Sequence, residues 1–267
     1  MSTAQKIIKM LAIAFAIFLI VMIFSTIVRV GMAITGYFVP GRENIAISKE
    51  LNLDNISNID IDLEYANLNI KSGKKLSVNV DTDDIKITTD DNVLKIVEKK
   101  NKKLFKNEKR TVTLYIPDDM NFTAVNIETG VGAVTADNIC ADGLNLSLGV
   151  GKTIINNIMV KFADIETGTG DVLIKNGNLN NSTIEIGVGK LDVNADFTGT
   201  NKIEAGIGAL KLSLHNVDDY KIKFSKGLGS ISYNGDLIAN DKTIGNGSNY
   251  IDIDGGIGSI DVVTQTR

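Results

Sequence analysis

Two patterns in this 267-residue chain contain residue types that could bind or react with a ligand. The first is "LGVGKT", Leu148 to Thr153, which ends like the phosphate-binding loop of nucleotide-binding proteins. Such a loop needs a glycine five residues before Gly151, and Leu146 occupies that position. No copy of the pattern carries a third glycine for a dinucleotide-binding loop either. We therefore expect neither nucleotide binding nor any other cofactor.

The second pattern is a row of acidic residues that recurs with a nearly fixed spacing. Alternation predicts that the row points outward, so a cation is one possible companion and a glycosidase-like carboxylate pair is another. Two serines interrupt the row and no acid differs from its neighbours, which favours a solvated face without catalytic residues or a metal site. The row comprises Glu128, Ser147, Glu166, Glu185, Glu204, Ser225 and Asp254.

The chain contains one cysteine and one histidine, the two remaining residue types that could react or bind a metal. Cys140 is the only cysteine and His215 the only histidine, so an internal disulfide and a Cys/His zinc cluster are excluded. His215 follows an apolar strand near a turn and is interpreted as structural, and Cys140 is interpreted as a small buried filler.

A Gly-x-Gly pair recurs along the chain and must belong to the element that positions the acidic row. The first glycines are separated by 19, 19, 19, 19, 21 and 29 residues. A fixed period of this kind is typical of a solenoid in which each repeat forms one rung. The expected corner glycines are Gly130, Gly132, Gly149, Gly151, Gly168, Gly170, Gly187, Gly189, Gly206, Gly208, Gly227, Gly229, Gly256 and Gly258.

Apolar residues alternate with polar ones on both sides of each glycine pair. They stand three residues before the first glycine, between the two glycines, and four and six residues after the first. Stacked rungs would turn these positions into inward ladders, with the glycines at a corner that needs positive φ or a close backbone approach. We predict an all-β fold, a slim two- or three-sided β-solenoid with rungs of about 19 residues, and leave its handedness open.

Residues 40–122 also read as β-structure. Alternating stretches such as "SNIDIDLEYANLNI" (Ser57–Ile70) and "RTVTLYIP" (Arg110–Pro117) indicate strands, and Asp90-Asp91-Asn92 indicates a turn. This region is expected to form irregular early rungs or a sheet that caps the solenoid, and residues 123–267 are expected to form the Gly-x-Gly rungs.

The N-terminal region is expected to be a membrane anchor. Met10–Val28 contains no charged residue over 19 positions, close to the length that spans a bilayer core. Lys6 and Lys9 before it favour a cytoplasmic tail at residues 1–9, a single transmembrane helix within residues 10–39 and an extracytoplasmic C-terminal part. The alternative is a cleaved signal peptide, because "GMA" at Gly31–Ala33 offers small residues for cleavage.

Charge separates one basic segment from an acidic body. The net charge is −4, which gives no reason to expect a nucleic-acid partner. Lys95–Arg110 holds eight basic and two acidic residues, so it could contact anionic lipid or wall polymer, or protect a β-edge from aggregation.

The sequence resembles a known family at one stretch in particular. "VTLYIPDDMNFTAVNIETGVGAVTADN" (Val112–Asn138), followed by Gly-x-Gly repeats and preceded by one apolar segment, is similar to the bacterial putative-adhesin family of β-strand-repeat proteins, which includes LiaG-like envelope proteins. The resemblance covers roughly residues 45–264 and implies a repeat fold outside the membrane. It implies no catalytic residues.

These observations favour a non-enzymatic, membrane-tethered scaffold or adhesin-like binding module of the cell envelope. An envelope-stress signalling accessory is the alternative, and a polysaccharide-active β-helix enzyme is less favoured. The partner would be an envelope protein or a wall polymer, and the oligomeric state is left open. The long spacing before Gly256 inserts residues 236–248, which we expect to protrude as a contact loop. Its candidate contact residues are Ile238, Asn240, Asp241, Lys242 and Asn246.

Overall fold

The computed structural model describes residues 47–48, 53, 55–99, 110–215 and 219–265. Contacts divide the chain into two compact units, residues 1–44 and residues 45–267. The described residues belong to the second unit and contain strands, turns and a single 3₁₀ position. Among these described residues, no helix is long and apolar enough to cross a bilayer. The apolar stretch Met10–Val28 and the core of the basic run, residues 100–109, lie outside the described residues.

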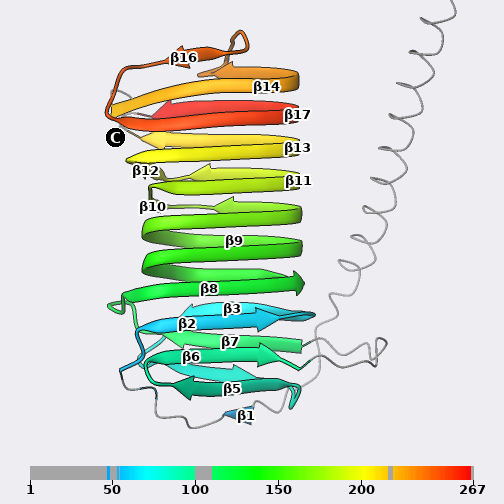
Figure 1. Ribbon diagram of the computed structural model, residues 1–267, viewed down its shortest axis with the longest axis vertical. Coiled ribbons are helices and arrows are strands. Elements are labelled where there is room, and N and C mark those ends of the chain that lie inside the picture. Colours follow the sequence, from blue (N-terminus) through cyan, green and yellow to red (C-terminus); the bar gives the residue numbers. More distant parts are fainter. Residues whose placement is uncertain (1–46, 49–52, 54, 100–109, 216–218, 266–267) are drawn as a thin grey trace, which may run out of the picture. The chain divides into compact units, whose positions relative to one another are not determined.

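Rungs of about 19 residues stack into one sheet system of 17 strands. Figure 1 shows how the rungs lie one above another. The middle rungs run through β9 (Val134–Ile174), β11 (Ser182–Asn194) and β13 (Thr200–His215). These strands pair in parallel with a constant offset, so that Ile184 lies between Ile165 and Ile203. A third short side is formed by β10 (Gly177–Asn180) and β12 (Asp196–Thr198). The predicted all-β solenoid is confirmed, and its middle rungs are three-sided.

The remaining strands form the two ends of the stack. They are β1 (Ile47–Ser48), β2 (Asn58–Leu63), β3 (Ala66–Ser72), β4 (Ser77–Val80), β5 (Ile85–Asp90), β6 (Val93–Glu98), β7 (Arg110–Ile116), β8 (Phe122–Val131), β14 (Tyr220–Tyr233), β15 (Asp236–Leu237), β16 (Lys242–Ile244) and β17 (Asn249–Gln265).

The core consists of apolar ladders that run from rung to rung. Three of the four predicted ladder positions are buried in nearly every rung, because side chains of like size stack at each level. The buried ladder three residues before the corner contains Ile127, Leu146, Ile165, Ile184, Ile203, Ile253 and Phe224.

The fourth position, between the two glycines, was expected to face inward and does not. Val150, Ile257 and Leu228 are 39%, 44% and 68% exposed. A Gly-x-Gly corner reverses the direction of the chain, so its middle side chain projects from the outside of the bend.

The corner glycines are required mainly by the neighbouring rung. A Cβ on Gly187 would lie 2.5 Å from the carbonyl oxygen of Gly168. At Gly189 the same atom would lie 1.8 Å from the carbonyl oxygen of Gly170, and the φ of Gly189 is +147°. The second glycine of this corner therefore needs both positive φ and close approach, whereas the first needs only close approach.

The N-terminal end is not stacked in sequence order. The rung formed by β2 and β3 lies one level inside the end, because β2 pairs with β6 and β8 and β3 pairs with β7 and β9. The antiparallel strands β5 and β4 then cover β6 and β7. The described residues before β8 thus contribute both early rungs and a cap, and the predicted turn at Asp90–Asn92 is confirmed between β5 and β6.

The C-terminal end repeats this arrangement. β17 is last in sequence but pairs in parallel with β13 on one side and β14 on the other, so β14 is the outermost rung. β15 and β16 pair antiparallel with β14 and cover its edge (Figure 1). Residues 236–248, expected to protrude, therefore include the two short strands that cap the stack.

Candidate functional site: an acidic groove along the stack

The acidic row forms one continuous line once the rungs are stacked. Parallel register places Glu128 next to Ser147, Glu185 between Glu166 and Glu204, and Asp254 between Glu204 and Ser225. Adjacent strands lie about 4.8 Å apart, so neighbouring carboxylates are within range of mutual repulsion. The outward orientation predicted for the row is consistent with the exposed side chains of Glu128, Glu166 and Glu185.

One member of the row was missed by sequence reasoning. Asp62 in β2 pairs with Glu128 and extends the row by one rung toward the N-terminal end. Its rung has Glu64-Tyr65-Ala66 at the corner in place of Gly-x-Gly, so the glycine spacing does not reveal it. The alternation "IDIDLEYA" aligned with "VNIETGVG" would have revealed it.

The row lines a groove rather than a flat face. A groove of about 980 Å³ follows the stack from Asp62 to Asp254. The carboxylates share its lining with the first glycine of each corner, as at Gly149, Gly168 and Gly187. Because glycine has no side chain, the backbone itself is accessible along the groove.

Among the described residues, one groove carboxylate, Glu204, is paired with a lysine. Lys202 forms an ion pair with Glu204, and the hydrogen bond that its ammonium donates to that carboxylate raises the pKa of Lys202 above its usual value. Lys223 forms a similar ion pair of 3.1 Å with Asp252, which raises the pKa of Lys223, but neither residue lines the groove. No ion pair is found for Glu128, Glu166 or Glu185 among the described residues, so the middle of the groove retains its negative charge.

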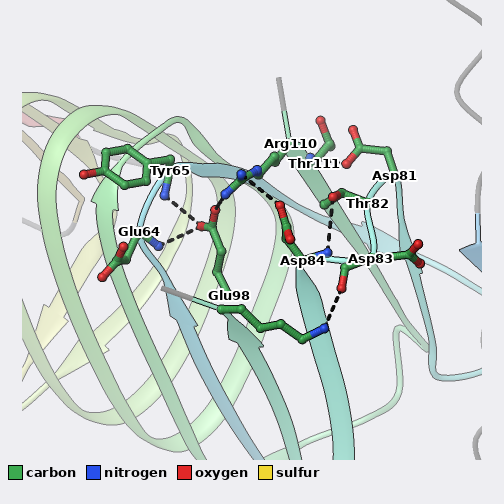
Figure 2. A network of polar contacts seen from close by, with 10 residues as sticks. Glu64, Tyr65, Asp81, Thr82, Asp83, Asp84, Glu98, Arg110 and Thr111 are labelled. Carbon is green, nitrogen blue, oxygen red and sulfur yellow. Dashed lines mark hydrogen bonds and ion pairs between the residues drawn. The ribbon is translucent and has the colours of Figure 1, made fainter. Parts of the chain in front are cut away.

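A second polar cluster, which the sequence did not predict, lies where residues 100–109 are inserted between β6 and β7. It consists of Glu98, Arg110 and Asp84. Glu98 is 3% exposed and accepts hydrogen bonds from the backbone amides of Glu64 and Tyr65, each 2.8 Å long. Arg110 donates to the other oxygen of Glu98 and lies 2.9 Å from Asp84 (Figure 2). Glu98 and Arg110 flank residues 100–109, so this ion pair joins the two stems of the insertion.

The other single residues examined in the sequence have structural partners. His215 Nδ1 lies 3.1 Å from Asp196 Oδ1, on the side of the solenoid formed by β12. Cys140 is half-buried rather than buried, and its Sγ lies 3.2 Å from Asn121 Oδ1. Neither residue lines the groove. Within the described part of the chain, no group of three His, Cys, Asp or Glu side chains has the arrangement of a metal site.

The predicted contact residues belong to the C-terminal cap. The side chain of Asn240 forms two hydrogen bonds with the backbone of Lys226. Its Oδ1 accepts from the Lys226 N–H at 2.8 Å, and its Nδ2 donates to the Lys226 carbonyl at 3.0 Å. Lys242 pairs with Phe224 across the β14–β16 ladder. Ile238 packs against the core, and Asp241 adopts a positive φ of 57° in the turn before β16.

Comparison with known proteins places this architecture in a family. Residues 56–257 match the Toastrack DUF4097 family. The chain belongs to the Toastrack DUF4097 family. This Toastrack region includes all residues that line the groove, from Asp62 to Gly256. No curated protein matches the chain.

Three solved structures that match this Toastrack chain do so at low identity and with TM-scores below 0.5. One, named a putative adhesin, is from Bacteroides fragilis; it shares 15% identity at a TM-score of 0.47, with 84% of this chain and 98% of that one covered. Another, named a putative cell adhesion protein, is from Clostridium sporogenes, with 16% identity, a TM-score of 0.39 and coverage of 84% and 100%. A third, named a putative lipid binding protein, is from Parabacteroides distasonis, with 17% identity, a TM-score of 0.39 and coverage of 84% and 98%. The family resemblance drawn from the sequence is confirmed by the match of residues 56–257 to the Toastrack DUF4097 family.

Proposed function

We propose that this protein is a non-enzymatic binding module of the bacterial cell envelope, tethered to the membrane by Met10–Val28 and carrying its solenoid outside the cytoplasm. The observation that carries the proposal is the groove, in which a carboxylate recurs at every level except that of Ser147. Catalysis requires unlike groups in distinct environments at one place, whereas a repeated group suits an elongated ligand contacted many times.

The chemistry of the groove defines the ligand class. Asp62, Glu128, Glu166 and Glu185 present carboxylates at intervals of one or two rungs, and the glycines between them leave the backbone accessible. An elongated molecule with repeated positive charges fits this surface. Each exposed contact is weak, about 1 kcal/mol or less, so affinity would arise from several contacts along the stack.

The test compares two triple variants of the full chain, purified in a nonionic detergent. The groove variant combines Glu128→Gln, Glu166→Gln and Glu185→Gln. The control combines Asp119→Asn, Asp171→Asn and Asp236→Asn, which removes the same charge from exposed positions outside the groove. Retention of solubilised envelope proteins and of wall polymer is then measured at low and high salt.

We expect the groove variant to retain at least tenfold less of one envelope component, and the control to retain as much as the unmodified chain. Equal retention by both variants would refute the groove as the binding surface. Release of sugar from wall polymer by the purified chain would refute a non-enzymatic role.

The tethered topology is tested separately. Protease added to intact protoplasts should digest the chain beyond about Arg42, because Lys6 and Lys9 favour an N-terminus in the cytoplasm. Protection of the C-terminal part until the cells are lysed would contradict this orientation.

A further inference from the structure

One aromatic residue is exposed on the outer face of the stack, beside a hollow. The hollow has a volume of about 290 Å³ and is lined by residues of β8 and β9. Phe162 lines it and is 60% exposed. A single exposed apolar side chain is ordinary on a protein surface. The ring of Phe162, however, borders a cavity that also contains polar groups.

The hollow is open because the neighbours of Phe162 on this face are small. Ala124 pairs with Gly143, and the offset of 19 residues between rungs places Gly143 next to Phe162. In each rung the next residue along the chain is buried, so these three positions face outward. The bare backbone at Gly143 therefore lies at the floor of the hollow, beside the aromatic ring.

The fold does not require a glycine at position 143. A Cβ there would lie 3.6 Å from the carbonyl oxygen of Thr123, an ordinary van der Waals distance, and the φ of Gly143 is not in the left-handed region. Every other described glycine has either a positive φ or a neighbouring atom within 2.8 Å of the Cβ position. A glycine inside a strand weakens that strand, and it often marks a place where a ligand approaches the backbone.

Three polar side chains with free hydrogen-bonding groups line the same hollow. Asn126, Asn145 and Asp164 stand two residues after the outward positions of their rungs, and all three are exposed. None of these side chains bonds to another described residue. Elsewhere stacked asparagines bond to each other, as where Asn157 Nδ2 donates to Asn138 Oδ1 at 2.8 Å. The two amides and the carboxylate are therefore available to a ligand.

These groups define the chemistry of the ligand. A pyranose ring presents a face of C–H groups that packs against an aromatic ring, and its hydroxyls both donate and accept hydrogen bonds. Small-molecule sites have volumes of about 300–1,000 Å³, so a hollow at the lower end of this range suits one sugar ring. Asp164 and the neighbouring Glu166 of the acidic row disfavour an anionic ligand.

We propose that this hollow binds one neutral pyranose residue of a glycan. The C–H face of the sugar packs against Phe162, its edge approaches the backbone at Gly143, and its hydroxyls bond to Asn126, Asn145 and Asp164. The site shares no lining residue with the acidic groove and does not depend on the ligand proposed for that groove.

Saturation-transfer NMR on the full chain tests the site, in a polyoxyethylene detergent that carries no sugar headgroup. The probes are cellotriose, maltotriose and triacetylchitotriose, and trigalacturonic acid is their anionic counterpart. Phe162→Ala removes the ring and Gly143→Val fills the hollow. Met159→Ala is the control, because it removes an exposed apolar side chain of the same strand outside the hollow. Titration gives the dissociation constants, and circular dichroism gives the melting temperatures.

We expect at least one neutral probe to bind the unmodified chain and the Met159→Ala variant alike, with saturation transferred mainly to C–H protons of one ring face. Trigalacturonic acid should bind at least tenfold more weakly. Phe162→Ala and Gly143→Val should each weaken binding of the neutral probe at least tenfold, and Gly143→Val should melt no lower than the unmodified chain.

Four outcomes would each overturn the proposal. They are failure of all three neutral probes to bind, unchanged binding by Phe162→Ala or Gly143→Val, equal or tighter binding of the anionic probe, and a lower melting temperature of Gly143→Val.

Discussion

At the scale of single residues, the corners depend on contacts between the backbones of adjacent rungs. Gly189 faces the carbonyl of Gly170 at a distance that excludes any Cβ, and its φ is one that other residues rarely adopt. Lys190, the next residue, is exposed and forms only a surface ion pair with Asp192. Adjacent residues of one strand therefore differ sharply in how much substitution they tolerate.

Gly189→Ala should lower the free energy of unfolding by about 3 kcal/mol or more, because positive φ costs about 1–3 kcal/mol and the clash adds to it. Lys190→Ala should cost about 1 kcal/mol or less. Urea denaturation of both variants measures the difference, and similar losses would contradict the assigned corner geometry.

Glu98 is the residue with the largest expected polar contribution. Glu98→Ala leaves Arg110 and two backbone amides without their acceptor, and breaking a buried ion pair in this way costs about 3–5 kcal/mol. Glu166→Ala, which removes an exposed carboxylate of the groove, should cost about 0.5 kcal/mol or less. Denaturant midpoints of the two variants measure these losses. A Glu98→Ala variant as stable as Glu166→Ala would show that the Glu98–Arg110 ion pair is dispensable for stability.

At the scale of elements, the caps cover the open edges that the outermost rungs of a solenoid would otherwise expose. The last parallel rung exposes a row of backbone donors and acceptors that could pair with another molecule. β16 covers the Ile222–Phe224 part of β14, and β15 covers its end through a tight turn at Asn234-Gly235, where both residues have positive φ. The Asn-Gly dipeptide is a strong hairpin signal, so this turn could have been predicted from sequence.

Replacing residues 239–246 with a Gly-Ser sequence of equal length should remove the β16 pairing and free the β14 edge. We expect far-ultraviolet circular dichroism to change little and the chain to associate end to end as concentration rises, because a free edge is a template for pairing. Sedimentation velocity measures this. Lys242→Ala, which keeps the backbone pairing, is the control, and a replaced chain that stays as monodisperse as the control would contradict the capping role.

Much of the fold was accessible from the sequence because its signals are periodic. The 19-residue spacing and the alternation around each glycine pair predicted the rungs, the buried ladders and the acidic row. The groove was not predicted, because concavity arises only when bare glycines stack beside side chains. The Glu98–Arg110 ion pair was not predicted either, since it joins residues separated by an insertion that breaks the repeat.

At the scale of the whole stack, the order of the rungs was also beyond the sequence. The rungs have nearly the same apolar pattern, so the sequence does not indicate which rung is adjacent to which. Ile253, for example, lies between Ile203 and Phe224, although Phe224 precedes it in the sequence. A subtle signal exists in the aromatic residues of β14, where Phe224 and Tyr233 pack edge to face at 6.3 Å. Large rings of this kind close the end of a core whose inner levels hold mostly Ile, Leu and Val.

Removal of residues 249–267 tests the inserted rung. In a solenoid stacked in sequence order this truncation would shorten the stack by one level and leave the rest intact. Here it removes β17 from between β13 and β14, so β14 and its cap lose their support. We expect loss of a cooperative thermal transition at the C-terminal end, measured by calorimetry and by dispersion of amide resonances. A truncated chain that melts in one transition, only slightly below the intact chain, would argue against the insertion.

The inserted rungs also determine how the solenoid would respond to mechanical force. A strand at an open edge can be unzipped one hydrogen bond at a time when its end is pulled. β2 and β17, the long strands nearest the two ends of the sequence, instead have a parallel neighbour on each side. Tension applied through β2 or β17 must therefore shear two ladders at once, so these two strands resist fraying because each lies inside the stack rather than at its open edge.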